Sequence, residues 1–368
     1  MKRKSTKIIL SIILILVSIT ILVLLIISHG KTSVFKDAQG KKLENSIAEM
    51  KYVKIGGINQ FILIRGENKK NPILLILHGG PGTSELPLFR KYNSFLEKHY
   101  TVVQWDQRGA GKSYSENIPI SCLSVDQLIQ DTHELTNYLK IRFNQHKIFI
   151  LGHSWGSYLG LSTVHKYPDD YYAFIGTGQM TNQSESEKLS FNYVMNKAKE
   201  QENAIAIKEL NEIGEYNLSN LNKIGIANWF EVQRKWLLKF NGIIYNSENY
   251  FNLIYLPYIF NREYTLSDKL SIFKGSKISI DNMFPTVLTT NLKKTIKELG
   301  LPIYILQGAY DYTTSYNLAK EYFDMIEAPK KKFITFEKSS HNPAFEEPEK
   351  FNQIMIKEVL GENFKLIE

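Results

Sequence analysis

Short, continuous apolar runs recur along this chain and strongly limit what it can fold into. They read ILLIL at Ile73–Leu77, TVVQW at Thr101–Trp105, KIFIL at Lys147–Leu151 and PIYIL at Pro302–Leu306. Such runs are typical of strands that are buried on both faces of a parallel sheet. Stretches with helical spacing, such as Val125–Ile141, lie between them. The alternation predicts βαβ units and a mostly parallel sheet with helices on both faces.

The alternation stops near residue 180 and resumes near residue 298. Residues 180–297 are polar, helical in tendency and rich in aromatic side chains. We therefore predict a helical insertion at 180–297 between two parts of one α/β core. The first part of the core is expected at residues 51–179 and the second part at 298–368.

The N-terminus contains a long uncharged segment. Residues 8–28 read IILSIILILVSITILVLLIIS, and a helix of that length is about 30 Å long, which matches the hydrocarbon core of a bilayer. A cleaved signal peptide is the alternative, but its apolar region is shorter and an A-x-A-like site follows it. We expect residues 1–30 to form an uncleaved transmembrane anchor and residues 31–50 to form a linker.

Charge predicts the orientation of this anchor. Lys2, Arg3, Lys4 and Lys7 precede the apolar segment, and no acidic residue accompanies them. A dense basic cluster on a short tail favours a cytoplasmic N-terminus. The chain is therefore expected to be a single-pass cell-membrane protein whose folded domain lies outside the cytoplasm.

Composition excludes several classes of partner. The formal net charge is +8, and half of it comes from residues 1–30, so the remainder is only mildly basic. No Lys/Arg run falls on a segment expected to fold, which argues against nucleic-acid binding. Cys122 is the only cysteine, so an intrachain disulfide or a Cys-rich metal site is impossible. Histidines and acids do not follow metal-ligand spacing, and no metal or organic cofactor is expected.

Gly152-His153-Ser154-Trp155-Gly156 fits the pattern G-x-S-x-G. It directly follows the strand predicted at Lys147–Leu151 and opens a helix, which is the context this pattern needs. A sharp strand-to-helix turn would lift the Ser154 hydroxyl clear of the sheet. We predict Ser154 as a catalytic nucleophile and the Trp155 N–H as one donor to an oxyanion.

A second glycine-rich turn follows the strand Ile73–Leu77. It reads His78-Gly79-Gly80-Pro81-Gly82. The loop at this place supplies the second oxyanion N–H when a G-x-S-x-G serine is the nucleophile. We assign that donor to Gly80.

The nucleophile needs a base and a residue that orients the base. In the α/β-hydrolase fold, which we predict here, the chain order is Ser, then Asp or Glu, then His. Asp311 follows the strand PIYIL, and His341 follows the next strand, so they are predicted to complete the triad with Ser154. The rival acids are Asp324, inside a predicted helix, and Asp281, inside the insertion.

Asp106–Ser113 reads DQRGAGKS and ends in Gly-x-Gly-Lys-Ser. The upstream G-x-x-x-x-G spacing of a phosphate-binding loop is missing, so we do not expect phosphate binding there.

Together these motifs resemble the prolyl iminopeptidase-like branch of the α/β-hydrolase superfamily. The resemblance implies a helical cap, here 180–297, and release of an N-terminal proline or another residue from peptides. It also implies that acids of the cap hold the free amine of the substrate. The segments that carry it are His78–Gly82 (HGGPG), Asp106–Ser113 (DQRGAGKS), Gly152–Gly156 (GHSWG), GAYD ending at Asp311 and SSHNPAFEEPEKF from Ser339.

The departures from the family concern specificity. GAYD replaces the usual Gly-Arg-x-Asp, and no single acid of the insertion matches the amine-binding position. An aminopeptidase acting on small peptides is therefore the first expectation, and an esterase acting on small esters is the alternative. A non-catalytic binding protein is a third. The candidate acids are Glu185, Glu187, Glu200, Glu202, Glu212, Glu215 and Glu231.

Overall fold

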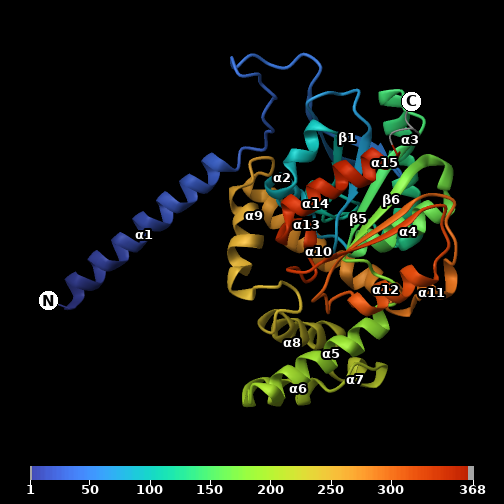
Figure 1. Cartoon of the computed structure of the whole chain (residues 1–368). Coiled ribbons are helices and arrows are strands. Elements are labelled where there is room, and N and C mark those ends of the chain that lie inside the picture. Colours follow the sequence, from blue (N-terminus) through green and yellow to red (C-terminus); the bar gives the residue numbers. More distant parts are fainter. Residues whose placement is uncertain (1, 364–368) are drawn as a thin grey trace.

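The computed structural model describes residues 2–363 and is built around one eight-stranded sheet (Figure 1). The strand order is β1-β2-β4-β3-β5-β6-β7-β8. The pairs β1–β2 and β2–β4 are antiparallel, and every pair from β4 to β8 is parallel. The strands are β1 (Ile47–Ile55), β2 (Ile58–Gly66), β3 (Ile73–Leu77), β4 (Thr101–Trp105), β5 (Ile148–His153), β6 (Tyr171–Thr177), β7 (Ile303–Gly308) and β8 (Lys331–Phe336).

Helices cover both faces of the sheet, as the alternation in the sequence predicts. The helices of the core are α2 (Leu86–Tyr92), α3 (Val125–Phe143), α4 (Trp155–Lys166), α12 (Tyr316–Met325), α13 (Pro343–Glu346), α14 (Pro348–Ile354) and α15 (Gly361–Asn363). A π-helical turn, Met355–Leu360, joins α14 to α15.

Strand β3 is apolar along its whole length because both of its faces are buried. Ile73, Leu75 and Leu77 of β3 enter a core shared with α3, α4 and α12. Leu74 and Ile76 point the other way, into a core shared with α2, α13 and α14. Successive side chains of a strand alternate between faces, so a continuous apolar run is what a two-faced core requires.

The chain between β6 and β7 forms helices that lie mostly to one side of the sheet (Figure 1). Four of these helices, α5 to α8, share a small hydrophobic core of their own, centred on Trp229 and Trp236. The α10 helix returns to the main core through Met283 and Val287. The helices are α5 (Gln183–Glu200), α6 (Ala204–Ile213), α7 (Leu218–Ile224), α8 (Ile226–Lys239), α9 (Leu256–Phe260), α10 (Leu266–Thr289) and α11 (Leu292–Thr295).

The prediction that residues 31–50 form a linker is partly wrong. Strand β1 begins at Ile47 and pairs there with Gly66 of β2, so the core starts before residue 51. The preceding residues also contact the folded domain. The Lys31 N–H donates to the carbonyl of Arg262 over 3.1 Å, and the Arg65 guanidinium donates to the carbonyl of Ser33 over 2.6 Å. Polar composition alone did not reveal these contacts.

Helix α1 (Lys2–Ile27) projects away from the rest of the chain (Figure 1). Its segment Leu10–Ile27 is long and apolar enough to cross a membrane, and none of that segment is buried. The residue after it, Ser28, contacts the domain, because the Lys269 ammonium on α10 donates to the Ser28 hydroxyl over 2.7 Å.

Candidate active site

Ser154 lies on a strained turn between β5 and α4. Its backbone has φ 53° and ψ −119°, a conformation that side-chain-bearing residues rarely adopt. Glycines on either side allow the turn to pack. A Cβ on Gly152 would lie 2.1 Å from the Gly156 carbonyl oxygen, and one on Gly156 would lie 2.1 Å from that of Leu77. Helix α4 begins at Trp155, directly after the serine, as the G-x-S-x-G pattern predicts.

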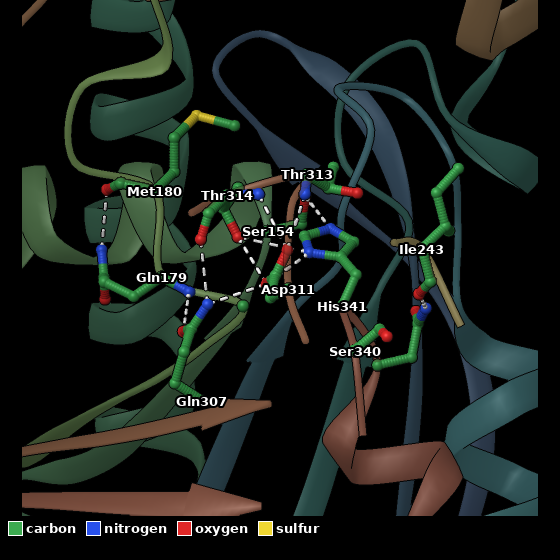
Figure 2. Close-up of polar contacts among 12 residues, drawn as sticks. Ser154, Gln179, Met180, Ile243, Gln307, Asp311, Thr313, Thr314, Ser340 and His341 are labelled. Atoms are coloured by element: carbon green, nitrogen blue, oxygen red, sulfur yellow. Dashed lines mark hydrogen bonds and ion pairs between the residues drawn. The ribbon is translucent and has the colours of Figure 1, made fainter. Parts of the chain in front are cut away.

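The three residues predicted as a triad are brought together by the fold. His341 Nε2 lies 2.9 Å from Ser154 Oγ, and His341 Nδ1 lies 2.9 Å from Asp311 Oδ2 (Figure 2). Ser154 follows β5, Asp311 follows β7 and His341 follows β8, so all three lie at the carboxyl edge of the sheet. This edge is where ligands bind in open α/β folds. All three residues are buried.

Four further donors fix the Asp311 carboxylate. The N–H groups of Thr313 and Thr314 donate to Oδ1 over 2.8 and 2.9 Å, and the Thr314 hydroxyl and the Gln307 amide donate to Oδ2 over 2.8 and 2.7 Å. With this carboxylate facing Nδ1, the hydrogen-bond network assigns the proton of His341 to Nδ1 and leaves Nε2 free to accept from Ser154.

Neither rival acid reaches His341. Asp281 lies on α10 and pairs with Lys277 over 2.9 Å, and Asp324 pairs with Lys320 on the exposed side of α12. The sequence did not point to Gln307 or Thr314. The only available signal was their nearness to Asp311, since Gln307 lies four residues before it and Thr314 three residues after it.

The glycine-rich loop after β3 is held by His78 and Gln107. His78 Nδ1 donates to the Gly79 carbonyl over 2.8 Å, and His78 Nε2 accepts the Gln107 N–H over 3.1 Å. Burial lowers the pKa of His78, which agrees with a neutral ring that donates from one nitrogen and accepts on the other. The Gln107 side chain also accepts from the Trp155 indole over 3.0 Å, so it links this loop to the start of α4.

The segment Asp106–Ser113 therefore has a structural role in the core. The Asp106 carboxylate accepts from Ser84, Tyr264 and the Lys112 N–H, and Arg108 pairs with Asp131 over 2.8 Å in the interior. Sequence reasoning rejected a phosphate site here but did not predict that Gln107 would brace the loop of Gly80.

A cavity of about 320 Å³ opens onto Ser154 and Gly80. The helices between β6 and β7 form most of its wall, and the wall is largely apolar. Gln183 is the most buried polar residue of the wall, and its Oε1 has no hydrogen-bond partner among residues 2–363. The other lining residues are Met180, Ile226, Ala227, Phe230, Arg234, Ile280, Asp281, Phe284, Pro285, Leu288 and Thr313.

Of the acids named as candidates for amine binding, only Glu187 is buried, and it lies behind the cavity wall. Its carboxylate is already paired, because Arg234 donates to both oxygens and the Gln183 amide donates to Oε1 over 2.6 Å. Glu185 is half-buried, and the acids from Glu200 to Glu231 in that set are exposed. Asp281 is the carboxylate that lines the cavity.

A serine, a histidine and a carboxylate in hydrogen-bonded series, beside a backbone loop and a helix N-terminus, form the kind of site that hydrolases use for acyl transfer. Residues 72–348 match the family model described as the alpha/beta hydrolase fold, so the chain belongs to that family. Within the described residues 2–363, no group of three or more His, Cys, Asp or Glu could hold a metal ion.

Similarity to known proteins places the chain among the prolyl iminopeptidase-like hydrolases of this family. A probable aminopeptidase, YbaC, of Bacillus subtilis is 30% identical over 84% of this chain and 95% of its own length. A proline iminopeptidase of Heyndrickxia coagulans is 26% identical over 77% of this chain and 89% of its own. The structure of a proline iminopeptidase of Mycobacterium smegmatis shares the fold, with a TM-score of 0.64 and 15% identity over 87% of this chain and all of its own.

Gly178 gives a first test of the geometry. Its φ is 54°, and a Cβ there would lie 3.0 Å from Cε1 of His341. We expect Gly178→Ala to displace the imidazole and to lower kcat by about 10–100-fold, since about 1 Å of misplacement has that effect. Gly57→Ala is the control, because Gly57 has φ 81° and nothing within 4 Å of its Cβ position. Equal kcat values for the two variants would contradict the close approach of Gly178 to the imidazole of His341.

The raised pKa of Glu346 predicts that the stability of the protein depends on pH. It accepts the N–H groups of Ser340 and Asn342 over 3.0 and 3.1 Å, on either side of His341, and burial raises its pKa from 4.5 to about 7. Between these values the folded state binds the proton more tightly, so this group lowers the free energy of unfolding as pH rises from 4.5 to about 7.

Glu346→Gln removes that titration. The free energy of unfolding of the variant, relative to wild type, should therefore rise as pH is raised through this window. Urea unfolding at several pH values measures it. A difference that is constant with pH would contradict the assignment.

Proposed function

We propose that Ser154 is the nucleophile of a serine hydrolase, that His341 is its general base and that Asp311 orients the imidazole. The observation that carries the proposal is the hydrogen-bonded series from Ser154 through His341 to Asp311, which opens into the cavity. The strained backbone of Ser154 supports it, since strain of this kind is retained where function needs it.

The N–H groups of Gly80 and Trp155 are the proposed oxyanion donors. Trp155 is the first residue of α4, so its N–H has no carbonyl partner within the helix. Gly80 lines the cavity beside Ser154 and has φ 116°, and a Cβ there would lie 2.7 Å from the N atoms of Gly82 and Thr83. Only glycine fits this loop conformation.

The reaction proceeds in two halves. Ser154 Oγ attacks the carbonyl carbon of the substrate while its proton moves to His341 Nε2, and negative charge develops on the carbonyl oxygen between the two N–H donors. His341 then delivers the proton to the leaving nitrogen or oxygen as the bond to carbon breaks. Water repeats the sequence on the acyl-enzyme and regenerates the free serine. Asp311 stabilises the imidazolium that forms in both halves.

We propose an aminopeptidase of the prolyl iminopeptidase type, which releases an N-terminal residue from small peptides. The cavity of about 320 Å³ is at the small end for ligand sites, which suits one residue as the acyl group. The unpartnered Gln183 Oε1 and the Asp281 carboxylate are acceptors on its wall and are the candidates for holding an N-terminal amine. The names of the relatives support this substrate class.

An esterase that acts on small esters is the second candidate. The apolar character of the cavity wall favours it, because Ile226, Phe230, Ile280, Phe284 and Leu288 all face the space above Ser154. The pairing of Glu187 with Arg234 also favours it, since this buried carboxylate is not free to bind an amine.

We further propose that α1 anchors the enzyme in the cell membrane with its N-terminus inside, and that the catalytic domain lies outside the cytoplasm. The apolar segment Leu10–Ile27 and the basic residues before it support the proposal. The contacts of Ser28 and Lys31 with the domain favour an uncleaved helix over a signal peptide. Cleavage after these residues would remove them, together with their contacts, from the mature chain.

Substrate panels separate the two activities. Ser154→Ala should lower kcat at least about 10³-fold on every substrate, while Ser162→Ala, farther along α4, should leave it unchanged. For wild type we expect release of arylamine from prolyl or other aminoacyl arylamides. Turnover of short p-nitrophenyl esters with none of any aminoacyl arylamide would establish the esterase instead.

Fractionation of cells tests the anchor. The full chain should stay with membranes after an alkaline wash, retain its N-terminal residues by intact mass, and be digested by protease added outside spheroplasts. A matched chain without residues 1–27 should be soluble. A soluble full-length product that has lost the helix would identify a signal peptide.

A further inference from the structure

Glu85 and His153 form a buried pair beside the site, and the mechanism above does not use them. Glu85 directly precedes α2, shortly after the glycine-rich loop, and His153 is the last residue of β5, immediately before Ser154. Both residues are buried, with 7% of Glu85 and 2% of His153 exposed. Groups that ionise are rarely buried this deeply unless they are paired.

The pair bridges three loops of the site. Glu85 Oε2 accepts the Gly79 N–H over 3.0 Å, and Glu85 Oε1 lies 2.6 Å from His153 Nδ1. His153 Nε2 lies 3.0 Å from the carbonyl oxygen of His341. One continuous series of hydrogen bonds therefore runs from the loop of Gly79 and Gly80, past the residue before Ser154, to the backbone of His341.

The partners fix where the protons lie. A carbonyl oxygen can only accept, so His153 Nε2 must carry a hydrogen and donate it to His341. A second proton lies between Nδ1 and Glu85 Oε1, and the pair carries no net charge whichever atom holds it. Burial by itself lowers the pKa of His153, but the nearby charge of Glu85 and the hydrogen bonds outweigh burial and raise the pKa.

This arrangement also excludes His153 as an alternative base. Its ring centroid is 5.0 Å from that of His341, but both of its nitrogens are engaged, by Glu85 and by the His341 carbonyl. It has no free lone pair to accept the proton of Ser154.

The backbone of His341 is thereby held from two sides. Its N–H donates to the carbonyl of Ile243 over 3.0 Å, and its carbonyl accepts from His153. The Asp311 carboxylate holds the ring but not the peptide. Because Ser154 and His341 are 2.9 Å apart, a shift of the peptide by a fraction of an ångström would weaken their hydrogen bond.

We propose that Glu85 and His153 are positioning residues that set the distance between His341, Ser154 and the oxyanion loop. The inference rests on the proposed roles of Ser154 and His341. Neither Glu85 nor His153 lines the cavity, so they act through the groups that meet the substrate. Removing the link to His341 should therefore lower kcat and leave KM nearly unchanged.

His153→Asn is the main variant, because Asn retains a polar group near the position of Nδ1 and removes the Nε2 donor. Glu85→Gln is the conservative variant, since its amide can accept the Gly79 N–H and donate to a neutral His153. The control is His133→Asn, which disrupts a histidine–carboxylate pair with Asp170, 2.9 Å apart and remote from the site.

Each variant is titrated with a fluorophosphonate, so that kcat is expressed per reactive serine, and thermal unfolding is followed in parallel. A purely structural role would reduce the reactive fraction but not kcat per reactive site. We expect kcat per site to fall about 10–100-fold in His153→Asn with KM within about threefold, and to fall less than about fivefold in Glu85→Gln and His133→Asn.

Wild-type kcat per site in His153→Asn would overturn the inference. If that variant does not fold, Glu85→Gln decides instead. This variant keeps the hydrogen bonds and the zero net charge of the pair, so a fall in kcat per site of more than about tenfold would overturn the inference. Failure of the proposed function has a different signature, since wild type itself would then not react with the fluorophosphonate.

Discussion

The close approach of helix α4 to strand β3 is the contact on which the site depends. Gly156 lies so near the carbonyl of Leu77 that a single methyl group would be 2.1 Å from it. This contact allows β5 to pass into α4 within one residue, and Ser154 occupies that residue with a positive φ. The strain, on the order of 1–3 kcal/mol, is sustained by the fully buried strand β5 that precedes the turn and by its neighbour β3. The turn directs the hydroxyl toward His341 and the cavity.

The parallel sheet then brings the other parts to the same edge. The loop of Gly80, Ser154, Asp311 and His341 follow strands β3, β5, β7 and β8, which lie close together in the sheet although the residues are far apart in the sequence. Hydrogen bonds link these loops to one another. Gln107 connects the loop of Gly80 with α4, and Gln307 braces the Asp311 carboxylate. The pair of Glu85 and His153 reaches from the same loop to the backbone of His341. The site is therefore one network, and the helices between β6 and β7 add the wall that faces the substrate.

The sequence alone predicted the features that depend on a short stretch of chain, such as the strands, or on the order of residues along the chain, such as the triad. The apolar runs identified β3, β4, β5 and β7 to within two residues, since burial on both faces gives a strand a short continuous apolar run. The G-x-S-x-G turn and the chain order of acid and base pointed to residues that the structure places in hydrogen-bonding contact. Sequence could not predict the roles of Glu85 and Gln107, because their partners lie 68 and 48 residues away. It could not predict the role of Gln307, because its contact with Asp311 depends on how the loop turns after β7. Nor could it reveal that Arg234 neutralises Glu187, since this pairing arises only when α5 packs against α8.

The central claim is that Ser154 alone is activated. Tryptic peptide mapping by mass spectrometry, after brief exposure of the intact protein to a fluorophosphonate, tests it most directly. We expect a single phosphonylated residue, Ser154, and no adduct once His341 is replaced by alanine. An adduct on another serine, or no adduct on the folded wild-type protein, would contradict it.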